Sequence, residues 1–210
     1  SNQNLKTAIF STWTDNRTKL LGDGLREAGG SKLDYYFDEL ELDKNRFEVN
    51  SENDRIGKID DLVTLNASEY IRSNSPDLSW VYLQHTDNVG HSYGDSDEFE
   101  KAVQLMDIRV GKIWEAVSER ANKYPEDWLI IVTTDHGRDL LGGHHHGEQS
   151  DRERTIWIVT NGKELSPRFY NLPGIVDILP SICLHMRINI PGRISGKIDG
   201  KSFFEALPSR

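Results

Sequence analysis

The chain has 210 residues, which suits one domain of ordinary size, and its 36% hydrophobic and 28% charged residues are typical of globular proteins. Its formal charge of −9, with no basic stripe to offset it, excludes a general nucleic-acid binder, although bound divalent cations can still make a phosphorylated substrate acceptable. No apolar run approaches the ~20 residues that span a bilayer, and the single cysteine, Cys183, excludes a disulfide framework.

Strand-like and helix-like segments alternate along the chain. Residues 6–13 are rich in β-forming side chains and indicate a strand, and helical periodicity follows over residues 17–28. Residues 31–53 mix polar and aromatic side chains, and we expect little regular structure there. The rest of the pattern predicts helices over residues 54–73, 96–124 and 174–186, and buried strands over residues 79–84, 128–133 and 155–160.

This alternation predicts an α/β fold with a mainly parallel central sheet flanked by helices. No repeat, low-complexity tract or convincing linker interrupts the pattern. We therefore expect a single domain over residues 1–210.

The histidines point to a functional site. Six of the seven lie in two short windows, residues 85–91 and 136–146, and each window directly follows a strand candidate. In open α/β sheets, ligands bind outside the carboxyl ends of the strands, where both windows would lie. In the first window, Asp87 and His91 bracket a turn that contains Gly90, and we expect them to converge on one ion.

The second window holds Asp135 and His136, followed by the run His144-His145-His146. Carboxylates with neutral imidazoles are ligands typical of zinc, and also of manganese or iron. Because no thiolate is available, an open, catalytic type of site fits better than a structural zinc site.

Each element by itself has a simpler interpretation. An Asp-x-x-x-His pair is common by chance, a lone histidine is often a hydrogen-bonded structural residue, and a histidine run can be a surface tract. Two such windows, each behind a hydrophobic strand, together favour a metal site.

The ordered motifs resemble the type I phosphodiesterase/nucleotide pyrophosphatase branch of the alkaline phosphatase superfamily. They are Asp87-x-x-Gly90-His91-x-x-Gly94, Thr134-Asp135-His136-Gly137, His146-Gly147 and Val176-Asp177-Ile178-Leu179-Pro180-Ser181, and the resemblance covers roughly residues 80–190.

The resemblance implies two divalent metal ions, with zinc as the expected metal. Asp87, His91 and His146 would hold one ion. Asp135 and His136 would hold the other, together with an aspartate from the first strand of the fold. His144 remains an alternative to His146, which we prefer because the glycine that follows it matches the family pattern.

Two family features have no match in this chain: the first-strand aspartate, and the nucleophilic threonine or serine near the first helix. Family members place both upstream of a segment such as residues 5–13. We therefore expect an alkaline-phosphatase-like domain that lacks its N-terminal strand or strands, with little activity on its own.

The activity implied by the resemblance is hydrolysis of phosphate esters by two-metal catalysis, through a covalent intermediate on a nucleophile outside this chain. A non-catalytic metal-binding domain, and a sulfatase or phosphomonoesterase of the same superfamily, remain open as alternatives. The expected partner is a small-molecule phosphate ester, without a nucleic-acid polymer or a membrane span. The sequence decides neither the oligomeric state nor the compartment, and the resemblance allows an exported protein.

Overall fold

The computed structural model describes residues 5–205, so the predicted domain range of 1–210 extends beyond the described part at both ends. The chain divides into two compact units. The first comprises residues up to Glu126 together with Leu141–His145, and the second comprises Asp127–Leu140 together with the residues from His146 onward. Among the described helices, none has the length and apolar character needed to cross a membrane.

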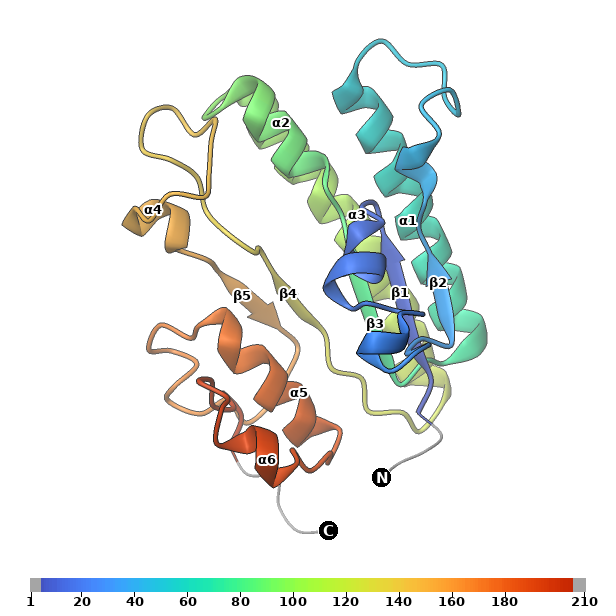
Figure 1. Ribbon diagram of the computed structural model, residues 1–210, viewed down its shortest axis with the longest axis vertical. Coiled ribbons are helices and arrows are strands. Elements are labelled where there is room, and N and C mark those ends of the chain that lie inside the picture. Colours follow the sequence, from blue (N-terminus) through green and yellow to red (C-terminus); the bar gives the residue numbers. More distant parts are fainter. Residues whose placement is uncertain (1–4, 206–210) are drawn as a thin grey trace. The chain divides into compact units, whose positions relative to one another are not determined.

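A three-stranded parallel sheet in the order β2-β1-β3 forms the centre of the first unit (Figure 1). The central strand β1 (Thr7–Ser11) pairs with β2 (Tyr35–Phe37) on one side and with β3 (Leu78–Tyr82) on the other. Ile9 and Phe10 of β1 are completely buried, as expected for a strand covered on both faces. This parallel sheet, flanked by helices, confirms the predicted α/β fold class.

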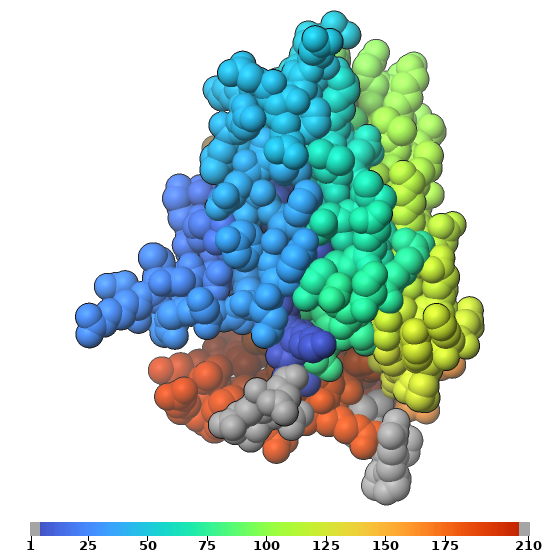
Figure 2. Space-filling model, turned by 90° about the vertical axis from the view of Figure 1, so that its right-hand side faces the viewer, coloured from blue at the N-terminus to red at the C-terminus, as the bar shows by residue number. Residues whose placement is uncertain are grey.

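Helix α1 (Glu52–Asn74) packs against β1 and β3. It begins at Ser51, whose hydroxyl accepts a hydrogen bond from the backbone N–H of Asp54 at 3.1 Å. In Figure 2, α1 lies at the surface between the segment of residues 31–50 and α3 (Asp97–Lys123), and it contacts both. The apolar face of α1 forms the core of the unit with the sheet, through Ala8, Phe10, Leu40, Ile56, Ile59, Val63 and Ala67.

The prediction of one helix over residues 17–28 is wrong. A π-helix, Asn16–Leu20, and a 3-10 helix, Arg26–Ala28, take its place. Gly22 and Gly24 lie between them with φ values of +62° and +81°. This left-handed backbone cannot continue a right-handed helix.

The segment of residues 31–53 contains β2 and a 3-10 helix, Leu40–Leu42, although its sequence predicts little regular structure. Three residues are too few to show the alternation that marks a strand. β2 forms because β1 provides its backbone hydrogen-bond partners.

The second unit contains an antiparallel pair, β4 (Ile131–Thr133) and β5 (Ile158–Thr160). The predicted parallel pairing therefore holds for the sheet of the first unit and not for this pair. The connection between the two strands contains only the short helix α4 (Asp151–Arg154), whereas parallel neighbours are usually joined by a long crossover helix.

The C-terminal part of the second unit is organised around Asp177, which is completely buried. Asp177 ends a 3-10 helix and directly precedes α5 (Ile178–His185), which is followed by the short helix α6 (Gly192–Ser195). The later Phe203 is also fully buried, so the tail contributes to this core and does not only cover the surface.

Candidate metal centre

Asp87 and His91 lie on α2 (His85–Tyr93), a helix that follows β3. The sequence predicts a turn around Gly90, and the structure has a helix instead. A spacing of four residues places two side chains on the same face of a helix. The Oδ2 atom of Asp87 and the Nε2 atom of His91 are accordingly 3.5 Å apart.

A backbone carbonyl fixes the orientation of the His91 ring. The Nδ1 atom of His91 lies 2.7 Å from the carbonyl oxygen of His144. Because a carbonyl oxygen can only accept, Nδ1 donates this hydrogen bond. Nε2 lies on the side of Asp87. Metal-binding histidines commonly donate their second N–H in this way.

The segment Leu141–His145 packs against the C-terminal end of α2. The carbonyl oxygen of Gly142 accepts a hydrogen bond from the backbone N–H of Asp95 at 2.7 Å. Gly94 permits this approach: a Cβ there would lie 2.1 Å from the Gly142 oxygen and 2.7 Å from Nε2 of His144, and its φ is +60°. Only glycine tolerates both the backbone conformation and the contact.

Asp135 and His136, directly after β4, repeat the arrangement seen at Asp87 and His91. Their Oδ1 and Nε2 atoms are 3.6 Å apart. The Nδ1 atom of His136 lies 2.8 Å from the carbonyl oxygen of Gly137, so Nδ1 again donates to a backbone carbonyl. The ring of His146 stacks on that of His136, with centroids 3.7 Å apart.

Gly137 sits where no side chain fits. Its N–H donates to the carbonyl oxygen of Glu153 at 2.7 Å. A Cβ at this position would lie 2.0 Å from the carbonyl oxygen of Arg152 and 2.9 Å from that of Thr155. The glycine of the Thr-Asp-His-Gly motif therefore lets α4 and the residue after it close tightly against the loop that carries His136.

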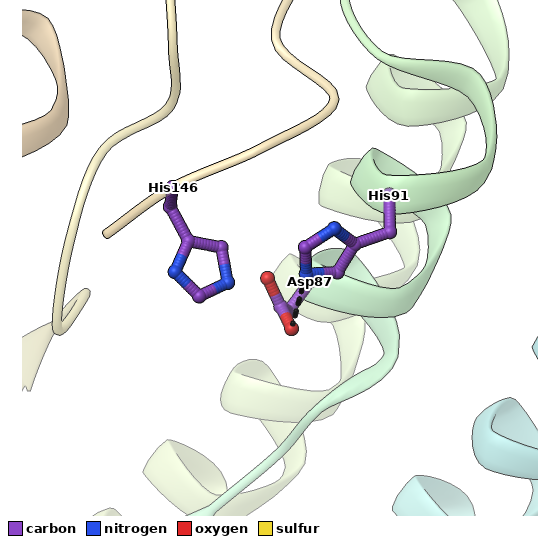
Figure 3. Close-up of side chains that lie close together, drawn as sticks. All are labelled: Asp87, His91 and His146. Carbon is purple, nitrogen blue, oxygen red and sulfur yellow. Dashed lines mark ion pairs between the residues drawn. The ribbon is translucent and has the colours of Figure 1, made fainter. Parts of the chain in front are cut away.

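Asp87, His91 and His146 form a group of potential metal ligands (Figure 3). Each offers one ligand atom, and these atoms all lie within 4.8 Å of one another. Figure 3 shows Asp87 and His91 projecting from the same helix, with the ion pair between them dashed.

These residues suit a zinc-sized cation. One carboxylate and two imidazoles form the donor set of catalytic zinc sites that keep a fourth position open. Tetrahedral geometry with bonds of ~2.0–2.2 Å separates ligand atoms by about 3.3–3.6 Å. The distance of 3.5 Å between Asp87 and His91 falls in that range. The side chain of His91 is 43% exposed, which leaves room for a substrate oxygen or water.

The neighbouring histidines make other contacts. The Nδ1 atom of His144 lies 3.3 Å from the carbonyl oxygen of His91, and the ring of His145 lies 6.4 Å from that of His91. His85 is buried, and its Nδ1 accepts a hydrogen bond from Arg109 at 3.2 Å. Burial and the Arg109 charge together lower the pKa of His85. His85 is thus a neutral residue of the helix packing.

The hydroxyl groups at the end of β1 are occupied by structural hydrogen bonds. Ser11 donates to the carbonyl oxygen of Trp13 at 2.8 Å, and Thr12 donates to Asp60 at 2.6 Å. The Thr14 hydroxyl accepts from the backbone N–H of Glu39 at 2.9 Å. Ser11, Thr12 and Thr14 are all buried. Because they are buried, none of the three hydroxyls is exposed to a substrate.

Comparison with known protein families identifies the family to which the chain belongs. The family described as type I phosphodiesterase / nucleotide pyrophosphatase matches residues 4–164, which include Asp87, His91, Asp135, His136 and His146. The chain belongs to this family, and the resemblance to this branch of the alkaline phosphatase superfamily is confirmed.

Curated relatives and a solved structure extend the comparison. The chain is 32% identical over 121 residues to GPI ethanolamine phosphate transferase 3 of Eremothecium gossypii, covering 50% of the chain and 11% of that protein. It is 26% identical over 160 residues to GPI ethanolamine phosphate transferase 2 of Schizosaccharomyces pombe, covering 67% of the chain and 21% of that protein. The chain thus spans only a small part of these relatives.

The fold also resembles that of phosphoglycerate mutase from Leishmania mexicana, with a TM-score of 0.58 and 16% identity. This match covers 96% of the chain and 37% of that protein. At this level of identity the likeness concerns the fold alone.

Proposed function

We propose that this chain is part of a divalent-metal-dependent enzyme that cleaves or transfers phosphoester groups. The observation that carries the proposal is the arrangement shared by His91 and His136. In each, Nδ1–H is bound to a backbone carbonyl, and Nε2 lies beside an aspartate at 3.5 or 3.6 Å. Two imidazoles are thereby oriented as ligands before any ion binds, which lowers the cost of ordering them.

In this proposal Asp87, His91 and His146 hold one cation, and Asp135 and His136 contribute to a second. Zinc is the proposed metal for both, since the donors are imidazole and carboxylate without thiolate. Bound there, two cations would neutralise the charge on the transferring phosphoryl group and lower the pKa of an attacking oxygen. The negative charges of Asp87 and Asp135 would offset part of the charge of the bound cations.

We propose that the attacking hydroxyl and a further acidic ligand come from outside residues 1–210. The engagement of Ser11, Thr12 and Thr14 in buried hydrogen bonds supports this, because these are the hydroxyls at the carboxyl end of β1. The 210 residues on their own should therefore turn over phosphodiesters only slowly, because loss of a covalent nucleophile usually costs several orders of magnitude.

A second candidate is transfer of ethanolamine phosphate to an alcohol, in place of hydrolysis. The names of the two curated relatives favour it. A transferase and a hydrolase of this kind share the cation site and differ in the acceptor, which is an alcohol in one and water in the other. The residues of the cation site therefore support both candidates equally. A sulfatase or phosphomonoesterase, and a metal-binding domain without activity, remain alternatives for the same site.

Metal binding is the first test. Calorimetric titration of the chain with zinc should show binding that is lost in His91→Ala and in His146→Ala. His185→Ala is the matched control, because His185 contacts the backbone oxygen of Asp127 and lies in neither histidine window. Zinc binding that survives in His91→Ala and His146→Ala would refute the ligand assignment.

Activity is the second test. The protein at its native length is assayed with the 4-nitrophenyl ester of phosphoethanolamine, a diester, and with 4-nitrophenyl phosphate, a monoester. The proposal expects turnover of the diester that requires a divalent cation and is lost in Asp87→Ala. Adding glycerol and analysing the products distinguishes transfer, which gives a glycerol ester, from hydrolysis. Zinc binding without turnover of either ester would favour a non-catalytic metal-binding domain.

A further inference from the structure

Asp60 is a completely buried carboxylate in α1 that reaches the ends of three other segments. Its Oδ1 atom accepts hydrogen bonds from the Thr12 hydroxyl at 2.6 Å and from the backbone N–H of Gln84 at 3.0 Å. Its Oδ2 atom accepts from the backbone N–H of His85 at 2.9 Å. One side chain thus connects the residue after β1, the residue before α2 and the first residue of α2.

Arg109 of α3 completes this network. Its guanidinium lies 3.8 Å from Oδ2 of Asp60, and it also donates to the carbonyl oxygen of Gly57 at 2.9 Å. Guanidinium and backbone N–H groups can only donate, so the oxygens of Asp60 act toward them as acceptors. Burial raises the pKa of Asp60, and the hydrogen bonds and the Arg109 charge offset this only in part. Burying a carboxyl group is costly, so packing alone does not account for Asp60.

Helix α2 needs an external partner at its N-terminus. Its N-cap residue, Gln84, makes no side-chain capping bond. The helix is 9 residues long and contains Gly90, and a helix of this length is marginal without tertiary support. A carboxylate at its N-terminus satisfies a free N–H and interacts favourably with the helix dipole.

We propose that Asp60 is a positioning residue that holds the first turn of α2, and thereby orients Asp87 and His91 toward a divalent cation. The effect of Asp60 on cation binding rests on the proposed function. The effect of Asp60 on the stability of the first turn of α2 does not. Asp87 lies in the first turn of that helix and His91 in the last. Loosening the first turn would therefore move both potential ligands.

The test compares Asp60→Asn with Val63→Ala by amide hydrogen exchange and zinc titration, on the whole chain. Asparagine keeps the size of the side chain but offers one acceptor oxygen in place of two. Val63, also completely buried in α1, belongs to the apolar core and provides a control for loss of stability alone. We expect Asp60→Asn to accelerate exchange selectively at residues 85–91. We also expect it to raise the zinc Kd about 10- to 100-fold, the range found for residues that orient metal ligands.

Two variants of Thr12 test the inference if Asp60→Asn does not fold. Thr12→Val removes one hydrogen bond to Asp60 without changing the shape of the side chain, and Thr12→Ser retains the hydroxyl. Thr12→Val should give a smaller change of the same kind, and Thr12→Ser should restore wild-type values.

The outcomes separate this inference from the proposed function. Equal acceleration of exchange throughout α1, α2 and α3 would show that Asp60 is a general stability residue and overturn the inference. Local loosening of α2 with an unchanged zinc Kd would overturn it as well. If the wild-type chain bound no zinc, the proposed function would fail, while the exchange measurement would still decide whether Asp60 holds α2.

Discussion

His91 donates its Nδ1–H to the backbone carbonyl oxygen of His144, 2.7 Å away and 53 residues later in the sequence. This bond joins the two histidine windows of the chain through a main-chain atom, so the contact does not depend on the identity of residue 144. It leaves Nε2 of His91 on the side of Asp87, 3.5 Å from Oδ2. The orientation of one potential metal ligand is therefore set by a distant loop.

Gly94→Ala should weaken this contact. The new methyl group would overlap the carbonyl oxygen of Gly142 and the ring of His144, at 2.1 and 2.7 Å, and would strain a backbone with φ of +60°. We expect a loss of about 2 kcal/mol in the free energy of unfolding, measured by urea denaturation, and a weaker affinity for zinc. Gly111→Ala is the control: it lies inside α3 with no heavy atom within 4 Å of the new Cβ. It should stabilise the protein by about 0.5–1 kcal/mol, and equal losses in both variants would contradict the role of Gly94.

The two proposed cation positions should differ in affinity. Asp87, His91 and His146 supply three ligands, whereas Asp135 and His136 supply two, which is fewer than catalytic zinc sites normally have. Calorimetric titration with zinc should show one tight site and one weak or undetectable site, and His136→Ala should affect only the weak one. Two sites of equal affinity would mean that a further ligand lies within the chain.

Gly137→Ala should be strongly destabilising. Its Cβ would overlap the carbonyl oxygen of Arg152 at 2.0 Å, a backbone atom that cannot move without disturbing α4. We expect a loss of more than about 2 kcal/mol in chemical denaturation of the variant. Gly192→Ala provides the comparison, because no heavy atom lies within 4 Å of the Cβ at that position. Similar stability of the two variants would show that the backbone near Gly137 adapts readily.

Asp177→Asn should change the pH dependence of stability. Burial opposes ionisation of Asp177, but hydrogen bonds from Arg168 and from the backbone N–H groups of Lys201 and Gly174 outweigh it and lower the pKa of the carboxyl. A lowered pKa contributes stability above the unfolded-state value, and this is lost as the pH falls through the folded-state value. The variant should be about 2–3 kcal/mol less stable at pH 7.

The difference between wild type and Asp177→Asn should stay constant down to about pH 5 and shrink below about pH 4, near the ordinary pKa of aspartate. Urea unfolding at several pH values measures it. The exposed Asp199 supplies the control variant Asp199→Asn, which should show little difference at any pH. A difference for Asp177→Asn that persists unchanged at pH 3 would show that its charge is not the cause.

The long regular elements were predictable because their signals are local. The apolar spacing that gives α1 and α3 repeats over several turns, and Ser51 and Ser96 cap their N-termini. The helix predicted over residues 17–28 failed because Gly22 and Gly24 interrupt an otherwise helical pattern. α2 was missed because its nine residues include Gly90 and are mostly polar, so they show no apolar periodicity.

The sequence alone determined the chemistry available to this chain: carboxylates and imidazoles without thiolate, with Asp87 and His91 at a spacing that one helical turn brings together. The tertiary structure decided which nitrogen of His91 donates to a backbone carbonyl 53 residues away, and what holds the start of α2, through the buried Asp60. It also made Tyr35–Phe37 a strand, because β1 lies beside it. The physical reason is the sequence separation of the interactions. Residue type and periodicity reflect interactions between near neighbours in the sequence, whereas hydrogen bonds between distant segments form only when the chain has packed.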